Sequence, residues 1–281
     1  MGKRRPSGDG MVRLRENGRW EGRIVAGHKK NGDSIFRYIS ARTQKELMNK
    51  LHQNIEVYRD ADLCEDSKML LSEWLDRWLE EYAAPTVRDS TLKRYSQHIK
   101  LYIKPHLGSK QISKITTEDV QKLYNKLKKQ GRVKEHPKHG HELFGSMIHS
   151  IHGVLRQAMD AAVRERLVVA NPTIGVKLPK KTPAPMQILN EKQLERFMEE
   201  IKKDEHWHDF FYTEITTGLR RGEICGLMWS DFDEKKGTLS VRRTLHPKPG
   251  GGVVAGETKT GQGRRTIVLP PSTVQLLTER K

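Results

Sequence analysis

Apolar and polar residues alternate in two short segments near the N-terminus, and this alternation predicts β-strands. Residues 11–16 and 19–26 each place apolar or small side chains at every second position, with charged side chains among the others. Neighbouring residues of a strand point to opposite faces of a sheet, so the two sets occupy different faces. Asn17-Gly18 between the segments predicts a type I′ hairpin turn, because both residue types tolerate positive φ.

A third β-rich segment and a helix complete this first region. Residues 34–40 follow an Asn-Gly-Asp turn. Thr43 is a typical N-cap for a helix that continues through Tyr58 with apolar residues three or four positions apart. The pattern predicts a three-stranded sheet with one amphipathic helix on one face. The other face of the sheet is left open.

The middle of the chain has the apolar periodicity of four amphipathic helices. These are expected over residues 72–84, 90–104, 117–129 and 142–166. Ser90 is a candidate cap for the second helix, which Pro105 and Gly108 are expected to end. Asn171-Pro172 is expected to stop the fourth helix.

The last third of the chain is expected to be mainly helical with one β-hairpin. Asn190 and Gln193 have the spacing of a capping box, which predicts a helix start. The expected elements are helices over 190–203, 208–217 and from 221 to the Trp-Ser-Asp at 229–231, and strands over 237–244 and 264–269 with a glycine-rich turn between them.

Two polar stretches divide the chain into three expected domains. Residues 59–68 are polar and acidic, and residues 176–186 are rich in proline and lysine, as extended linkers are. We therefore expect a multidomain α+β protein. Its parts are an N-terminal three-stranded sheet plus helix at 1–62, a central four-helix domain at 68–176, and a mainly helical domain with a β-hairpin at 187–281.

The charge of the chain points to a polyanionic partner. Its 281 residues include 52 Lys and Arg against 35 Asp and Glu, a net charge of +17, and residues 1–60 alone carry +7. Nucleic acid is the commonest partner of so basic a protein. The two cysteines lie 161 residues apart and fit no zinc or disulfide framework, which favours a reducing cytoplasmic location. No apolar run is long enough to span a membrane.

Basic side chains gather on the faces that the expected core leaves uncovered. On the open face of the sheet we expect them to enter a DNA groove, and they are Arg13, Arg15, Arg19, Arg23 and Arg37. On the second and third helices of the middle domain we expect them to follow DNA phosphates, and they are Lys93, Arg94, Lys100, Lys104, Lys122, Lys126, Lys128 and Lys129. The alternative in both places is a solvated basic face. Five histidines between residues 136 and 152 have no cysteine nearby, so we expect no metal site there.

Two segments of the last domain carry residues suited to phosphate chemistry. Arg220 stands at the start of a helix, after Gly218 has ended the previous one, so a guanidinium and a helix N-terminus can face the same phosphate. Glu223 lies three residues further on the same side and can hold Arg220 in place. Lys259 is expected at a hairpin tip, where its ammonium can reach an oxyanion or protonate a leaving oxygen. The alternative is plain surface charge.

These segments resemble the tyrosine recombinases, also called the phage-integrase family. The family pattern Thr-Gly-x-Arg-x-x-Glu-x-x-x-Leu-x-Trp-x-Asp is matched in full by Thr217, Gly218, Arg220, Glu223, Leu227, Trp229 and Asp231. Lys259–Arg265, followed after Thr266 by Ile-Val-Leu-Pro, is similar to the family's β-hairpin lysine region. The middle domain resembles the family's core-binding domain through Ser90–Tyr95, Tyr102–Gly108 and Asn171-Pro172. The N-terminal sheet resembles the arm-binding module of integrases from conjugative transposons and prophages.

The resemblance implies a recombination reaction on double-stranded DNA that needs no cofactor and no metal. In the family, a tyrosine attacks the scissile phosphodiester and forms a 3′-phosphotyrosyl bond. Arginines stabilise the charge on phosphorus, and a lysine protonates the leaving 5′-oxygen. Carried over, Arg220 is the first arginine, Glu223 its supporting acid and Lys259 the hairpin lysine. The family also implies arm-type and core-type DNA sites and self-association on DNA.

The sequence departs from the family after its last expected strand. The family has a second arginine, a His or Trp and the nucleophilic Tyr there, but residues 271–281 contain no His, Trp or Tyr, and all seven tyrosines precede Arg220. We therefore expect the domain at 187–281 to be the N-terminal part of an incomplete catalytic domain. The expected function is site-specific integration of a mobile genetic element. The alternative is a catalytically inactive DNA-binding protein that occupies recombination sites.

Overall fold

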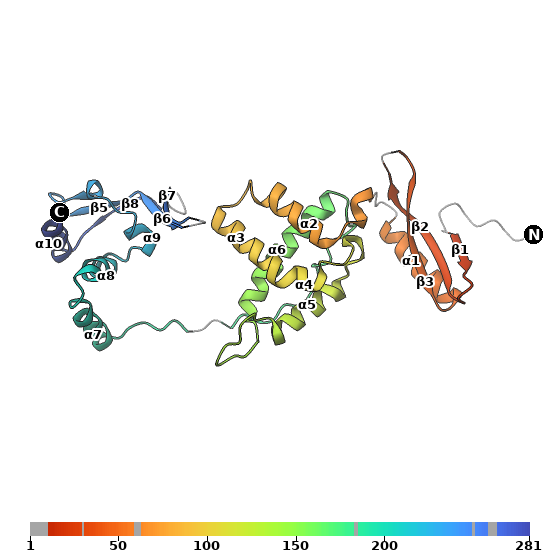
Figure 1. Cartoon of the computed structure of the whole chain (residues 1–281), viewed down its shortest axis with the longest axis horizontal. Helices are drawn as coiled ribbons and strands as arrows, with labels where there is room; N and C mark the ends of the chain where they lie inside the picture. Colours follow the sequence, from red (N-terminus) through yellow and green to blue (C-terminus); the bar gives the residue numbers. More distant parts are fainter. Residues whose placement is uncertain (1–10, 30, 59–62, 183–184, 249–250, 258–262) are drawn as a thin grey trace, which may run out of the picture. The chain divides into compact units, whose positions relative to one another are not determined.

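The structure is a computed structural model that describes residues 11–29, 31–58, 63–182, 185–248, 251–257 and 263–281. The chain forms two compact units, residues 1–184 and 185–281, and each combines helices with small antiparallel sheets (Figure 1). The class is therefore mixed helical and β, as the sequence predicted. Within the described segments, no helix is long and apolar enough to cross a membrane.

Three antiparallel strands and one helix form the N-terminal part of the first unit. They are β1 (Met11–Leu14), β2 (Trp20–His28), β3 (Ser34–Ala41) and α1 (Gln44–Tyr58), in the sheet order β1-β2-β3. Helix α1 begins as expected, because the Thr43 hydroxyl accepts a hydrogen bond from the Glu46 N–H at 3.2 Å. Buried Leu47 and Leu51 pack against the sheet. Gly22 makes room for Leu51, since a Cβ at position 22 would lie 2.7 Å from the Leu51 Cδ1.

The turn between β1 and β2 is not the expected type I′ turn. Within this turn only Gly18 has positive φ, at +72°, and its N–H donates to the Arg15 carbonyl at 2.9 Å. The Arg15 N–H donates in turn to the Arg19 carbonyl, so five residues connect the strands. Asn17 contributes through its side chain instead, whose oxygen accepts from the Arg19 N–H at 3.2 Å.

The rest of the described first unit is helical. Its helices are α2 (Leu71–Trp78), α3 (Asp89–His98), α4 (Lys104–Leu107), α5 (Thr117–Gln130) and α6 (Gly145–Arg164). A π turn over Leu79–Ala83 extends α2, and another over Ile99–Ile103 joins α3 to α4. These correspond to the four expected helices. In the core, the buried Trp74 indole N–H donates to the Ala158 carbonyl at 3.0 Å and ties α2 to α6.

Two expected boundaries of the second of these helices are wrong. Arg88, rather than Ser90, occupies the cap of α3. Pro105 does not end the helix. It lies in the first turn of α4, where its missing N–H removes no helical hydrogen bond, and the wider π turn precedes it.

Helix α6 ends at Arg164, within two residues of the expected end at 166, but Asn171-Pro172 does not stop it. Arg166 adopts a left-handed conformation with φ +57°, which turns the chain out of the helix. Asn171 instead closes the loop that follows. Its Nδ2 donates to the Asp160 Oδ1 at 2.7 Å, and its Oδ1 accepts from the Thr173 N–H at 2.9 Å. Asn171 and Thr173 are both buried.

Backbone hydrogen bonds hold parts of both expected linkers against the first unit. The Leu63 N–H donates to the Ala26 carbonyl of β2 at 3.0 Å. The Lys177 N–H donates to the Gln121 side chain of α5 at 2.7 Å, and that side chain returns a hydrogen bond to the Lys177 carbonyl at 3.0 Å. Both segments are therefore packed over part of their length.

The second unit consists of short helices around a small sheet. Its elements are α7 (Glu191–Ile201), α8 (Glu205–Thr217), α9 (Arg221–Ile224), β4 (Phe232–Asp233), β5 (Thr238–Val241), β6 (Arg243–Pro247), β7 (Val253–Glu257), β8 (Arg265–Val268) and α10 (Pro271–Arg280). Strands β4, β5 and β8 form one antiparallel sheet, and β6 and β7 form a separate hairpin. Helix α7 starts as expected, since the Asn190 side chain accepts from the Gln193 N–H at 2.9 Å.

Several expected elements of this unit differ from the structure. The strand expected at 237–244 is two strands, because Leu239 and Val241 of β5 enter the core while Arg243 of β6 turns to an ion pair with Asp231. Strand β5 pairs with β8, and β6 pairs with β7, which the sequence did not predict. Trp229–Asp231 is a separate 3-10 turn, since α9 already ends at Ile224. Helix α10 was not expected either.

Replacing Asn171 by alanine is expected to destabilise the protein by about 2–3 kcal/mol. The Asp160 carboxylate and the buried Thr173 N–H lose their partner. Urea unfolding followed by circular dichroism measures this loss. Asn125→Ala is the matched control, because Asn125 is exposed on α5 and its oxygen accepts from Gln121 one helical turn away. Equal losses in the two variants would contradict the role given to Asn171.

Candidate active site

The chain reverses between α8 and α9, and this reversal places Arg220. The Thr217 hydroxyl donates to the Thr213 carbonyl in the last turn of α8, and Gly218 follows with φ +64°. The Gly218 N–H returns to the Glu214 carbonyl at 2.8 Å, which ends the helix. Arg220 then occupies the cap of α9, and its side chain is 79% exposed. Its guanidinium therefore faces solvent at a helix N-terminus.

Glu223 is the buried partner of Arg220. Its side chain is only 3% exposed, and it accepts hydrogen bonds from the Arg220 backbone N–H at 3.1 Å and from the Arg220 NH1 at 2.8 Å. Arg265 of β8 binds the same carboxylate, through NH2 at 3.0 Å and NH1 at 3.3 Å. One carboxylate thus joins the start of α9 to a strand that lies far away in the sequence. The pairing expected between Arg220 and Glu223 is present.

Arg265 is a site residue that the sequence analysis did not assign. The signal was present in the alternation of β8. Arg265 lies two positions from Ile267, so both side chains point to one face of the strand, and Ile267 packs against the core. An arginine on the core-facing side of a strand requires a carboxylate, because a buried charge is stable only when it is paired. Which carboxylate it meets is a tertiary contact that the local pattern does not contain.

The two arginines keep Glu223 ionised. Burial by itself would raise the pKa of its carboxyl, but hydrogen bonds from Arg265 and then from Arg220 outweigh burial and lower the pKa to about 2. Glu223 therefore carries its charge throughout the physiological range. The group of two guanidiniums and one carboxylate has a net charge of +1, and that charge lies toward the exposed Arg220.

The second half of the motif has a structural task in this fold. Asp231 is almost fully buried and pairs with the Arg243 guanidinium at 2.5 Å, while it also accepts from the Met228 N–H at 3.0 Å. Gly222 and Gly226 let β6 approach α9, since a Cβ at either position would lie 3.1–3.2 Å from a carbonyl oxygen of β6. Asp231 and these two glycines thus hold β6 against α9, the short helix that carries Glu223.

A shallow basic depression lies beside Arg265, with a volume of about 640 Å³. It is lined by Ser240, Val241, Arg242, Arg264, Arg265 and Thr266. Three arginines and two hydroxyl groups offer hydrogen-bond donors on one surface, and the Ser240 and Thr266 oxygens lie 3.1 Å apart across β5 and β8. Such donors suit an oxyanion such as a phosphodiester.

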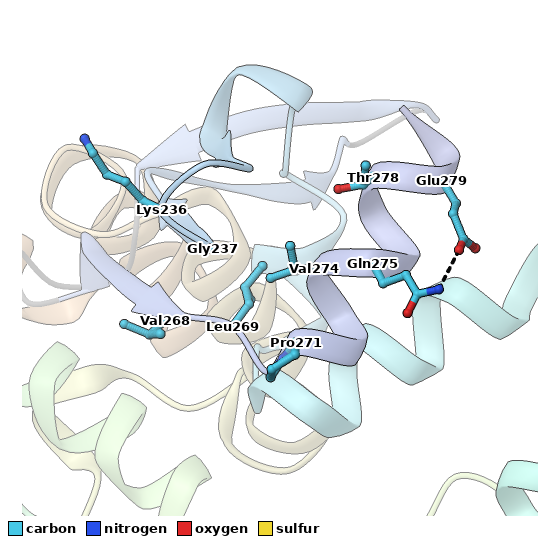
Figure 2. Close-up of a pocket in the computed structure, with 9 residues that line it drawn as sticks. All are labelled: Lys236, Gly237, Val268, Leu269, Pro271, Val274, Gln275, Thr278 and Glu279. Atoms are coloured by element: carbon cyan, nitrogen blue, oxygen red, sulfur yellow. Dashed lines mark hydrogen bonds between the residues drawn. The ribbon is translucent and has the colours of Figure 1, made fainter.

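A second concavity of about 610 Å³ lies beside α10 and has an apolar floor of Val268, Leu269, Pro271 and Val274 (Figure 2). Its polar lining includes Gln275, whose amide donates to Glu279 at 2.9 Å. Neither Arg220 nor Glu223 lines it. Arg265, the partner of Glu223, lines the basic depression instead.

Two other expectations about the site concern Lys259 and a metal ion. Lys259 lies outside the described residues, so its role stays a prediction. Among the described residues, no group of three or more His, Cys, Asp or Glu side chains is arranged to hold a metal ion. Within the histidine group, His152 shares a hydrogen bond of 3.0 Å with the Tyr124 hydroxyl, and His149 lies 3.0 Å from the Pro179 carbonyl, so both have a hydrogen-bond partner within the first unit.

The expected basic face of the N-terminal sheet is present, with one correction. Arg13, Arg15 and Arg23 lie with Glu21 on the face away from α1, and Arg19 is exposed in the adjoining turn. Arg37 does not belong to this face. It is the cross-strand partner of the core residue Ile24, and its NH1 donates to the Ser113 carbonyl at 3.1 Å. Arg37 therefore joins the sheet to the helical region.

The basic side chains expected on the second and third helices of the middle region lie on α3, α4 and α5. On α5, Lys122, Lys126 and Lys129 are exposed, although Lys122 pairs with Glu118 at 2.6 Å and Lys128 pairs with Glu142. Lys93, Arg94 and Lys100 are exposed on α3 and the π turn that follows it. Lys104 is half-buried and pairs with Asp76 of α2 at 2.5 Å, so part of its charge is neutralised. The contact of these residues with DNA stays a prediction.

Comparisons with known proteins give the relatives of this chain. Residues 70–128 match the family model of the phage integrase N-terminal SAM-like domain. A tyrosine recombinase XerC-like protein of Caldanaerobacter subterraneus is 25% identical over 273 residues, which cover 92% of this chain and 67% of the relative. An integrase of Saccharopolyspora erythraea is 22% identical, with 86% of this chain and 53% of the relative covered.

Solved structures give the same picture of the fold. The Tn1549 transposon integrase in complex with a circular intermediate DNA superposes with a TM-score of 0.64 at 21% identity, over 75% of this chain and 64% of that one. A lambda integrase dimer bound to a COC' core site superposes with a TM-score of 0.53 at 20% identity, over 92% of this chain and 68% of that one. This chain spans between about half and about two thirds of the length of these proteins.

Replacing Glu223 by glutamine is expected to lower the free energy of unfolding by about 3 kcal/mol near neutral pH. The folded pKa of about 2 lies below the ordinary value of 4.5, so the stabilisation is complete above 4.5 and is lost as the pH falls from there toward 2. Denaturant unfolding at a series of pH values measures the difference. Glu234→Gln, at an exposed position of the same unit, is the control. A difference that stays constant over this pH range would contradict the assignment.

Proposed function

The chain belongs to the tyrosine recombinase, or phage integrase, family, and on that premise we propose that it is a site-specific DNA recombinase of a mobile genetic element. The observation that carries the proposal is the Glu223 carboxylate shared by Arg220 and Arg265. Glu223 holds the exposed Arg220 guanidinium at the start of α9, and a guanidinium can bind a backbone phosphate through two N–H groups.

In the proposed reaction Arg220 stabilises the scissile phosphodiester as negative charge grows on its oxygens. A guanidinium held in advance by Glu223 needs no reorganisation when the pentacoordinate phosphorus forms, and such preorganised charge is the main source of electrostatic catalysis. Arg265 orients Glu223 and lines the adjoining basic depression. Lys259 is proposed as the proton donor to the leaving 5′-oxygen, from its place in the sequence alone.

The proposed layout has three parts with two DNA-binding surfaces. Residues 1–62 contact arm-type sites through the open sheet face, residues 68–176 contact core-type sites, and residues 187–281 hold the scissile phosphate. Two observations support the layout, namely the separate apolar cores of these regions and the basic faces described above. Lambda integrase is described as a dimer on a core site and as a tetramer on a Holliday junction, which supports self-association of this chain on DNA.

The alternative is a DNA-binding protein that occupies recombination sites without cutting them. The observation that favours it is that the basic faces of the first unit, with exposed Arg13, Arg19, Lys93 and Arg94, can attract duplex DNA without any cleavage step. A nicked suicide duplex that carries the recognised site separates the two functions. A 3′-phosphotyrosyl adduct on this chain supports the recombinase, and a purely non-covalent complex supports the alternative.

Replacing Arg220 by alanine is expected to weaken duplex binding by about tenfold and to reduce the slope of affinity against salt by about 1, as the loss of one phosphate contact does. Fluorescence anisotropy with a duplex selected by the wild-type chain measures both quantities. Arg221→Ala is the matched control, because it removes an adjacent exposed arginine that does not bind Glu223. Equal effects of the two changes would show that Arg220 contributes only general charge.

A further inference from the structure

The open face of the N-terminal sheet holds one buried carboxylate among its cations. Glu21 lies on the central strand β2, and its side chain is only 8% exposed. Its cross-strand partner Arg13 donates from Nε at 2.9 Å. Arg15 binds the same carboxylate at two points, from Nε at 2.8 Å and from NH2 at 2.5 Å. Two of the arginines expected to meet DNA are therefore held by one acid.

The apolar core does not account for this acid. The core side chains of the sheet, such as Ile24 and Ala26, lie on the other face against α1. Around Glu21 the open face carries exposed side chains: Tyr38 is 55% exposed, and the Arg23 guanidinium lies 4.3 Å from the centre of the Phe36 ring. A depression of about 160 Å³ is lined by Met11, Arg13, Glu21, Gly22, Arg23 and Tyr38.

The shared carboxylate changes what this surface can bind. It reduces the charge of the two arginines from +2 to a net +1, and hydrogen bonds from Arg15 and Arg13 hold the pKa of Glu21 below its ordinary value, so it stays charged at neutral pH. A guanidinium held at one edge keeps its other N–H groups available in a fixed direction. A phosphate that approaches competes for the same donors and is repelled by the carboxylate.

Base edges meet different conditions from phosphates at this surface. In the major groove, guanine offers two acceptors to the remaining N–H groups of one arginine. Two guanidiniums held in advance by Glu21 match such acceptors, whereas a duplex without them offers only phosphates, which the Glu21 carboxylate repels.

We propose that Glu21 is a specificity-determining residue, which fixes Arg13 and Arg15 for base edges and disfavours duplexes that offer phosphate contacts alone. This inference rests on the proposed function, because it requires that the sheet binds duplex DNA. Arg19 provides the contrast within the same module: it is exposed in the turn and forms no ion pair with a described residue, so it contributes general attraction.

The test uses the full chain and two duplexes. The first is selected by the wild-type chain from a randomised pool and is retained only if the Arg13→Ala/Arg15→Ala variant loses affinity for it. The second is a scrambled duplex of the same composition. Glu21→Gln is compared with Glu16→Gln, which removes the same charge from an exposed turn residue that forms no ion pair with a described residue.

Glu21→Gln is expected to bind the scrambled duplex about tenfold more tightly, with a salt slope steeper by about 1 to 2, since two arginines become available to phosphates. The ratio of the selected to the scrambled affinity falls, and Glu16→Gln leaves this ratio unchanged. Equal ratios in the two variants would overturn the role of Glu21. An equal loss of affinity for both duplexes, together with a lower melting temperature of the protein, would also overturn it, because a residue with a purely structural role gives this result. If no selected duplex depends on Arg13 and Arg15, the DNA contact of the sheet itself fails.

Discussion

The candidate site of the second unit depends on one interaction, the pairing of the buried Glu223 carboxylate with two guanidiniums. A carboxylate with 3% exposure is stable only when it is fully paired, and here it accepts from the Arg220 backbone, the Arg220 guanidinium and the Arg265 guanidinium. Removal of any one partner leaves a buried charge with too few donors. The helix turn that carries Arg220 and the strand that carries Arg265 are therefore held together by the group that also aims Arg220 at solvent.

A carboxylate shared by two arginines also occurs in the first unit, with a different consequence. Glu21 also binds two arginines, but both lie close to it in the sequence and all three lie on an open sheet face. At Glu223 the acid holds two elements together and leaves the Arg220 guanidinium exposed. At Glu21 the acid lies on the open face itself, where its proposed role is to lower the attraction for phosphates.

Local signals predicted the parts of this structure that depend on near neighbours in the sequence. The capping box at Asn190 and Gln193 and the pairing of Arg220 with Glu223 span three residues each, and both are present. Arg265 was missed because its partner lies 42 residues away, beyond the reach of any local pattern. Alternation along β3 did not show that Arg37 lies on the face of the sheet that α1 covers. The predicted extent of the strand at 237–244 was wrong because Arg243 turns toward Asp231, and this ion pair is also a tertiary contact.

Helix ends show the same limit. Pro105 is an ordinary stop signal, but a π turn before it moves the proline into a first turn, where it is tolerated. Asn171-Pro172 resembles a stop, yet a left-handed Arg166 ends α6 earlier and Asn171 serves a buried loop. Both outcomes depend on packing around the helix rather than on the residues that mark its end.

The central claim is that Arg220, held by Glu223, contacts one particular backbone phosphate of the recombination site. Neutral methylphosphonate groups can replace the phosphates of the selected duplex one at a time, and the affinity of each duplex can be measured for the wild type and for Arg220→Ala. The account predicts one position at which the wild type loses affinity and Arg220→Ala loses none, while the two proteins respond alike at the other positions. Identical profiles at every position would contradict it.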